Sequence, residues 1–295
     1  MEREQFFKHK FIPVGTIVLA ILVLWYVFAV ILNAPFQRDL DRRANVTSTT
    51  MEFIGKTLAQ PKPTLPAPHQ VAQNVFENTF LRAPINNRSL VYNAWVTLSS
   101  TAVGFAFGTV LGILIAVGIV HVVALDRSLM PWIITSQTIP ILAIAPMVIV
   151  VLAAVDITGL IPKALISTYL SFFPVAVGMV KGLRSPEVMH LDLMRTYNAS
   201  AWQTFWKLRV PASVPFLFTS MKVAIAASLV GAIVGELPTG AVAGIGAKLL
   251  AGSYYSQTID MWAALVAGSV LAAILVAIVS VVARIVDRAM GGRAA

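Results

Sequence analysis

The sequence predicts an all-α membrane protein with six transmembrane helices, and three observations lead to that prediction. Of the 295 residues, 58% are hydrophobic and 12% are charged, whereas a soluble domain has about 45–50% apolar and about 25% charged residues. The apolar residues gather into uncharged stretches, and a helix of about 20 such residues crosses about 30 Å of hydrocarbon. The net charge of +9 comes from Lys and Arg scattered between these stretches, which suits basic membrane edges and not a nucleic-acid surface.

The predicted spans follow the uncharged stretches in chain order. They are residues 11–32, the stretch between Arg88 and His121, the stretch between Arg127 and Asp156, the shorter stretch between Lys163 and Lys181, residues 214–238, and residues 261–283. The first is longer than the apolar part of a cleavable signal peptide, which has about 7–15 residues, so we expect a retained helix. The fifth contains Lys222 and Glu236, which we expect near opposite edges of the membrane.

Basic residues orient the chain. Arg3, Lys8 and Lys10 precede the first span and predict a cytoplasmic N-terminus. Six spans return the C-terminus to the cytoplasm, together with the loop 184–216. The predicted parts of the chain are a tail with the first helix (1–32), an extracytoplasmic segment (33–88), a core with five further spans (89–288) and a cytoplasmic tail (289–295). Four prolines within 61–70 predict an extended, non-helical strap along the outer surface.

Glycines and prolines inside the spans predict how the helices pack. Glycines recur at intervals of four in three pairs or runs: Gly104, Gly108 and Gly112; Gly178 and Gly182; Gly231 and Gly235. Small residues let helices approach closely in lipid, either inside one bundle, which is the simpler interpretation, or between subunits. Pro140, Pro146 and Pro174 predict kinks. The carbonyls that these prolines free face either a solute pathway or a neighbouring helix.

Several kinds of chemistry lack the residues they need. The sequence has no cysteine, its four histidines show no metal-ligand spacing, and it contains neither a phosphate-binding loop nor a hydrolase motif. We therefore expect no catalytic residues, no metal site and no cofactor in this chain. No carboxylate lies in the middle of a predicted span, so an ion-coupled drive inside the helices is not indicated. A self-sufficient secondary transporter or channel, and a membrane-embedded enzyme, are the alternatives.

The inner loop 184–216 is the place where an external source of energy would attach. It is polar and rich in helix formers. Pro186 is expected to open one short helix, and Pro211 and Pro215 to close the stretch. An amphipathic connector lying on the membrane surface is the simplest interpretation of this pattern.

The same loop resembles the EAA loop of bacterial ATP-binding-cassette (ABC) importer permeases. That family pattern has Glu-Ala-Ala, a glycine four residues on, and Leu-Pro after about a dozen more. The matching positions here are Asp192, Leu193 and Met194, then Asn198 with Ala199 after it, and finally Val210 and Pro211. The intervening stretch Ser200–Phe205 is also similar. Asn198 tolerates a left-handed backbone better than most non-glycine residues, whereas Leu193 and Met194 are bulkier than alanine and require a roomier partner groove.

Three further stretches resemble the same family. Residues 136–152 are similar to its third span with two prolines, 234–250 to its "Glu … Gly-Leu-Gly" segment, and 65–71 to an outer stretch of the branch for nitrate, sulfonates, taurine and thiamine precursors. Together with the loop they cover about residues 65–288. Four matches in the expected order carry more weight than any one of them.

The resemblance implies a type I ABC importer permease (MetI-like) in the bacterial inner membrane. It implies a second permease copy, identical or different, a cytoplasmic ATPase dimer that binds the ATP, and an extracytoplasmic solute-binding protein. It also implies a solute such as nitrate, a sulfonate or taurine, or a thiamine or flavin precursor. The residues expected to couple to the ATPase are Asp192, Leu193, Met194, Arg195, Asn198, Ala199, Ser200, Trp202, Gln203 and Pro211.

The pathway or its gate is expected near Pro140, Pro146, Glu236, Gly244 and Gly246. Glu236 either lines an outer gate, contacts the binding protein, or is a carboxylate hydrogen-bonded to helix ends. Gly244 and Gly246, together with Gly240, predict a sharply turned segment beside it. In the loop, Asp192 and Arg195 are expected to pair with charged groove residues. Trp202, Phe205 and Trp206 are expected to anchor the loop at the membrane edge or in the groove.

Overall fold

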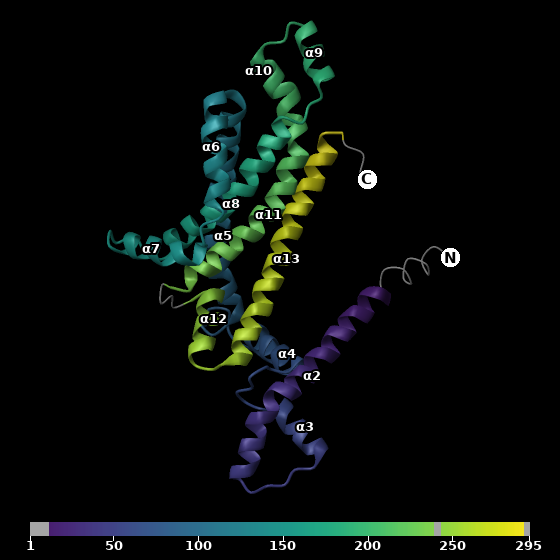
Figure 1. The fold of residues 1–295 in the computed structure, drawn as a ribbon, viewed down its shortest axis with the longest axis vertical. Helices are drawn as coiled ribbons and strands as arrows, with labels where there is room; N and C mark the ends of the chain where they lie inside the picture. Colours follow the sequence, from purple (N-terminus) through teal and green to yellow (C-terminus); the bar gives the residue numbers. More distant parts are fainter. Residues whose placement is uncertain (1–11, 239–242, 292–295) are drawn as a thin grey trace. The chain divides into compact units, whose positions relative to one another are not determined.

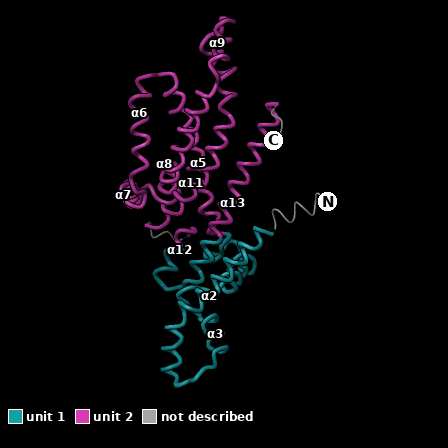
Figure 2. Tube along the Cα trace, turned by 45° about the vertical axis from the view of Figure 1, so that its right-hand side comes forward, with its two compact units in different colours: residues 1–91, 248–266 teal, residues 92–247, 267–295 magenta. Residues whose placement is uncertain are grey.

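The computed structural model describes residues 12–238 and 243–291, which form helices and turns without any strand (Figure 1). The chain divides into two compact units, coloured separately in Figure 2. Unit 1 comprises residues 1–91 and 248–266, and unit 2 comprises residues 92–247 and 267–295.

Within the described ranges, five helices are long and apolar enough to cross a membrane. They are α2 (Ile12–Arg43), α5 (Leu90–His121), α8 (Leu160–Leu183), the continuous helix Ala201–Glu236, and α13 (Thr258–Ala289). A sixth candidate is the pair α6 (Val123–Ser136) and α7 (Ile141–Ala153). Counting that pair as one span gives the six predicted from the sequence, so the all-α, six-span prediction is confirmed.

The third span differs from the single kinked helix that we expected. Its halves α6 and α7 meet at an angle of 98°. Pro140 is the N-cap of α7, and the residue before a proline is driven out of the helical conformation. The Tyr169 hydroxyl of α8 donates a hydrogen bond to the Ser136 carbonyl at the end of α6. The break is therefore caused by Pro140 and its exposed carbonyl is satisfied by a neighbouring helix, whereas Pro146 and Pro174 lie inside α7 and α8.

Unit 2 is built on close contacts between α5, α8 and α11 (Val210–Glu236). A Cβ atom added at Gly104 or Gly108 would clash with Ser167 or Ser171 of α8, and one at Gly112 would lie 2.8 Å from the Phe172 carbonyl. The pairs Gly178 and Gly182, and Gly231 and Gly235, mediate the contact between α8 and α11 in the same way. The interpretation of these glycines as packing residues inside one bundle is confirmed.

Small hydroxyl side chains tie the same three helices together. Ser167 Oγ on α8 donates to the Ser228 carbonyl on α11 at 2.9 Å, and Ser228 Oγ donates to the Thr101 carbonyl on α5 at 2.9 Å. All three residues are fully buried. Such bonds are available only because the glycines let the backbones approach, and they replace the water that lipid lacks.

In unit 1, α2 packs against the proline-rich strap. Asn33 is the centre of this contact, because its Nδ2 donates to the Leu65 carbonyl at 2.9 Å and its Oδ1 accepts from the backbone N–H groups of Thr64 at 2.8 Å and Leu65 at 3.1 Å. Trp25 Nε1 donates to the Pro66 carbonyl at 3.0 Å. The strap is therefore held by buried polar contacts to one face of the first helix.

Two boundaries in this region differ from the sequence prediction. The first helix continues past residue 32 to Arg43, because Asn33 and Gln37 turn buried side chains toward the strap and extend the packed face. The extended strap ends at Ala67, since Pro68 occupies the first position of α4 (Pro68–Phe76), where its missing N–H costs nothing. Between them lies the short helix α3 (Thr50–Leu58).

Gly108→Ala should lower the free energy of unfolding of the purified protein by about 1–3 kcal/mol, the usual cost of overpacking, because the added methyl group would clash with Ser171. The melting temperature should fall accordingly. Gly15→Ala is the matched control, since an added Cβ at Gly15 meets nothing within 4 Å. Equal melting temperatures for the two variants would contradict the close α5–α8 contact.

Candidate functional site

The loop between α8 and α11 folds into a short helix, a turn and a second helical start. Helix α9 (Val188–Thr196) begins two residues after Pro186, as predicted, with Glu187 as its N-cap. After the turn, α10 (Ala201–Thr204) leads through a π-helical turn, Phe205–Arg209, directly into α11. Figure 1 shows α9 and α10 at the tip of the α8–α11 pair.

The expectation that Pro211 and Pro215 end the loop is wrong. Both prolines lie in α11, and Pro211 is in its first turn, where a proline needs no hydrogen-bond acceptor. The π-helical turn immediately before Pro211 shifts the hydrogen-bond register and so absorbs the irregularity. The chain from Ala201 to Glu236 is thus one helical body, and the loop is joined to the fifth span without a flexible joint.

The turn after α9 has the left-handed backbone that the sequence allows for at Asn198. Asn198 has φ 51°, a left-handed conformation that asparagine adopts at small cost. Its N–H donates to the Arg195 carbonyl at 2.9 Å, and the N–H of Ala199 donates to the Met194 carbonyl at 2.9 Å. These two bonds are the Schellman arrangement that ends a helix and satisfies its last carbonyls.

The next helix starts with a reciprocal cap. Gln203 N–H donates to Ser200 Oγ at 3.2 Å, and Ser200 N–H donates to Gln203 Oε1 at 2.9 Å. Such a capping box satisfies two orphan donors at once. The angle between α9 and α10 is therefore set by two local devices, the Asn198 turn and the Ser200 cap.

The base of the loop is clamped to unit 2. Phe205 is 7% exposed and packs in a buried cluster with Ile119, Met179 and Leu183. Arg209 Nη1 donates to the Leu183 carbonyl at 3.3 Å, and Arg184 pairs with Asp126 of α6 at 2.9 Å. Phe205, which we expected at the membrane edge or in the groove, packs inside the bundle instead. Trp202 and Trp206 are exposed, and their expected contacts stay predictions.

None of the residues of α9 is buried, and most of them are exposed. Met189, Leu193 and Tyr197 recur at intervals of four and form an exposed apolar stripe, with exposures of 75%, 52% and 78%. Asp192 and Arg195 pair with each other at 3.1 Å on the surface, where an ion pair contributes little. This is an apolar helix face with charges beside it and no partner within the described residues.

A second cluster forms around Glu236, which is fully buried at the end of α11. Thr97 Oγ1 of α5 donates to its two carboxylate oxygens at 2.9 and 3.0 Å, and the Gly246 N–H donates to Oε2 at 2.8 Å. Lys163 of α8 contributes a positive charge close enough to act on the carboxylate. Glu236 is thus a carboxylate bonded to a helix end, which was one of the three interpretations offered by the sequence.

The helix end in question is the start of α12 (Ile245–Tyr254). Its first N–H groups are taken by side chains from other helices: Gly244 N–H by Asn93 Oδ1 at 2.7 Å, Ile245 N–H by Thr97 Oγ1 at 2.9 Å, and Gly246 N–H by Glu236. Negative charge is favoured at a helix N-terminus. The three side chains together hold residues 244–246, at the start of α12, within unit 2.

Both glycines at this point are required by close approach. Gly244 has φ 129°, and any Cβ there would clash with the Glu236 carboxylate, while one at Gly246 would clash with the Ile233 carbonyl. Glu236, Gly244 and Gly246 are therefore brought together as expected, whereas Pro140 and Pro146 belong to α7. Gly240 lies outside the described residues.

Asn93 and Thr97 were not identified as site residues from the sequence. A signal was present, because polar residues recur at helical spacing in an otherwise apolar span: Asn93, Thr97, Ser100 and Thr101. All four are buried. In lipid such residues need partners, and a systematic search for this periodicity would have found them.

The other features of the described residues concern metal ligands and one apolar cavity. No group of three His, Asp or Glu residues that could hold a metal occurs within the described ranges. An apolar cavity of about 310 Å³ lies between α5, α7 and α8. Its two hydroxyl-bearing residues, Thr168 and Tyr169, both donate to backbone carbonyls. The cavity wall is therefore apolar and offers no reactive group.

Comparison with known proteins identifies a family. Residues 108–292, more than half of the chain, match the model of the family described as "Binding-protein-dependent transport system inner membrane component". The match includes α9, the Asn198 turn and Glu236. A probable ABC transporter permease protein of Haemophilus influenzae is 29% identical over 68% of this chain and 76% of its own length.

Two relatives carry more specific names. The formylaminopyrimidine transport permease protein ThiX of Halalkalibacterium halodurans is 28% identical over 63% of this chain and 69% of its own length. The nitrate import permease protein NrtB of a Synechocystis species is 26% identical over 62% of this chain and 66% of its own length. The similarity thus extends to permeases named for different solutes.

Thr97→Val should destabilise the protein by about 1–3 kcal/mol, because Glu236 and the Ile245 N–H each lose a buried partner. Hydrogen–deuterium exchange at residues 244–247 should rise. Thr109→Val on the same helix is the control, since the buried Thr109 hydroxyl has no hydrogen-bond partner among the described residues, and we expect no loss. An identical response of both variants would argue against the anchoring of α12.

Proposed function

The chain belongs to the family of binding-protein-dependent transport system inner membrane components, and we propose that it is the permease subunit of an ATP-driven importer that couples to its ATPase through α9 and the Asn198 turn. Membership makes it a multi-pass inner-membrane transport component and not itself an enzyme. Partners of this family include an ABC ATPase and a solute-binding protein. The observation that supports the coupling role most directly is a short helix with no buried residue held on a clamped base.

The exposed stripe of α9 suits a groove in another protein. A helix of nine residues is marginal on its own, and docking would hold it. Met189, Leu193 and Tyr197 present apolar side chains for burial, and the exposed Asp192 and Arg195 can exchange their mutual pair for charges of the groove. We place Asp192, Leu193 and Met194 at the Glu-Ala-Ala positions of the family pattern.

The rigid base of the loop would let α9 pass its movement on to the membrane-spanning helices. Asn198 and Ser200 set the angle between α9 and α10, and α10 continues into α11 as one helical body. Phe205, Arg184 and Arg209 tie the base to α6 and α8. A displacement of α9 would then move packed helices as bodies, which is what a switch between inward and outward access requires.

The Glu236 cluster is proposed to hold α12 in place beside the pathway and not to bind solute directly. Its carboxylate is fully buried and engaged by Thr97 and Gly246. The break between α6 and α7 at Pro140 is the better candidate for a moving part, because an interrupted helix has no continuous backbone ladder to break.

For the solute we propose a small anion or organic molecule, such as nitrate, a sulfonate or taurine, or a thiamine or flavin precursor. Relatives named for nitrate and for formylaminopyrimidine transport support that range. A soluble binding protein would deliver the solute, and a second permease copy, identical or different, would complete the pathway. ATP would bind only to the partner ATPase.

Replacement of Asn198 tests the proposed coupling role. Asn198→Val should strongly reduce uptake and solute-stimulated ATP hydrolysis in proteoliposomes that contain the whole importer, because a β-branched residue disfavours the left-handed backbone by about 1–2 kcal/mol. Asn198→Gly removes the same side chain but permits the turn, and should retain activity. Full uptake by the valine variant would remove the Asn198 turn from the mechanism.

A further inference from the structure

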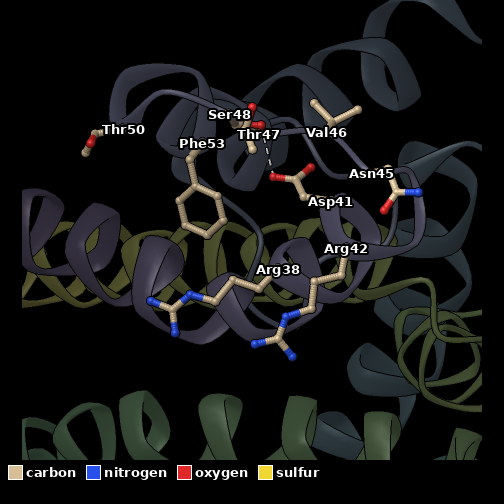
Figure 3. A pocket seen from close by; sticks show the side chains of 9 residues that line it. All are labelled: Arg38, Asp41, Arg42, Asn45, Val46, Thr47, Ser48, Thr50 and Phe53. Atoms are coloured by element: carbon tan, nitrogen blue, oxygen red, sulfur yellow. Dashed lines mark hydrogen bonds between the residues drawn. The ribbon is translucent and has the colours of Figure 1, made fainter.

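An open pocket of about 610 Å³ lies in unit 1 between the C-terminal part of α2 and the start of α3 (Figure 3). It is lined by polar side chains of both helices and of the turn between them, among them Arg38, Arg42, Thr47 and Thr50. The segment lies outside residues 108–292, which match the family model. Neither the fold nor the proposed transport mechanism accounts for it.

Two arginines dominate the charge of this pocket. Arg38 and Arg42 are one helical turn apart, and Figure 3 shows their side chains extending to the same side of α2. Arg38 lies over the Phe53 ring at 5.9 Å from its centroid and has no carboxylate partner within the described residues. Arg42 approaches Asp39 only at 4.0 Å, and both side chains are mostly exposed. Both guanidinium groups therefore have donors available.

The acidic residue of the pocket is already engaged. Asp41 accepts hydrogen bonds from Gln37 Nε2 at 2.9 Å and Ser48 Oγ at 3.0 Å, and pairs with Lys56 at 3.5 Å. Its charge is therefore compensated by Lys56 and not by the arginines. Thr47 and Thr50 line the same pocket.

The length of α2 places these arginines beyond the hydrocarbon. The helix has 32 residues, or about 48 Å at 1.5 Å per residue, whereas the hydrocarbon layer is about 30 Å thick. The apolar run ends at Leu32, and Arg38 follows about 9 Å further along the helix axis. That distance corresponds to the layer of lipid headgroups.

We propose that this pocket binds a phosphate group, either in the headgroup of an anionic lipid or as free phosphate, through Arg38 and Arg42. A planar guanidinium group can make two parallel hydrogen bonds to such an oxyanion. Arg38 and Arg42 lie on successive turns of α2, and both would bind the same phosphate group. The pocket is large enough to admit a headgroup together with its phosphate. Bound in this way, a lipid would hold the α2–α3 hairpin at the membrane surface.

Binding by purified protein tests the proposal without using transport as the readout. Native mass spectrometry measures retained phosphatidylglycerol, and calorimetry in detergent measures binding of inorganic phosphate. The Arg38→Gln/Arg42→Gln variant should weaken whichever binding the unmodified protein shows by at least about tenfold, since charge-assisted hydrogen bonds are lost. Retention of phosphatidylglycerol without phosphate binding identifies a lipid headgroup, and phosphate binding in detergent identifies a soluble anion.

Arg43→Gln is the matched control, because it removes the same charge from the same helix at a residue that does not line the pocket. Its binding should equal that of the unmodified protein. Arg38→Lys/Arg42→Lys keeps both charges and removes the planar fork, and should bind more weakly. The proposal is overturned if the unmodified protein binds neither probe, if Arg43→Gln loses as much binding as the double glutamine variant, or if the double lysine variant binds with unchanged affinity.

Discussion

Close approach between helix backbones is the constraint on which unit 2 depends. Lipid chains are as apolar as leucine, so helices gain little from burying apolar side chains against one another. They gain from dispersion contacts and from hydrogen bonds across the interface, and both need short distances. The glycines at positions 104, 108 and 112 provide those distances between α5 and α8, and Gly178 and Gly182 provide them between α8 and α11. Hydroxyl groups such as those of Ser167 and Ser228 then reach carbonyls of the neighbouring helix.

The loop that carries α9 is held rigidly because the helices on either side of it pack closely. Helices α8 and α11 flank the loop that carries α9, and Gly182 contacts Ser213 and Phe216 directly at the base of the loop. A displacement of α9 would therefore be transmitted to the packed helices α8 and α11, because no flexible hinge separates them from α9. Asn198 and Ser200 cap the end of α9 and the start of α10. Each cap supplies hydrogen-bond partners for backbone groups at a helix end that would otherwise have none.

A buried charge imposes the second constraint. Glu236 is fully buried, and an unpaired carboxylate in such a place would be strongly unfavourable. Hydrogen bonds from the Thr97 hydroxyl and from the N-terminus of α12, together with the positive charge of Lys163, offset this cost. One consequence is that α12 cannot leave its position without exposing the carboxylate. Of the three interpretations that the sequence offered for Glu236, these contacts fit the carboxylate that is hydrogen-bonded to a helix end.

The sequence by itself determined the features that depend on composition or on neighbouring residues. These include the membrane class, the six spans, the glycine contacts, the left-handed turn at Asn198 and the start of α9 after Pro186, because each follows from residues within a few turns of one another. Only the tertiary structure decided which distant groups meet. Thr97 and Glu236 form a hydrogen bond although they are 139 residues apart, and Asn33 bonds to the strap 32 residues later. A π-helical turn before Pro211 lets the helix continue through that proline. Burial and hydrogen bonding across helices select these outcomes, and no local pattern records which helix supplies the partner.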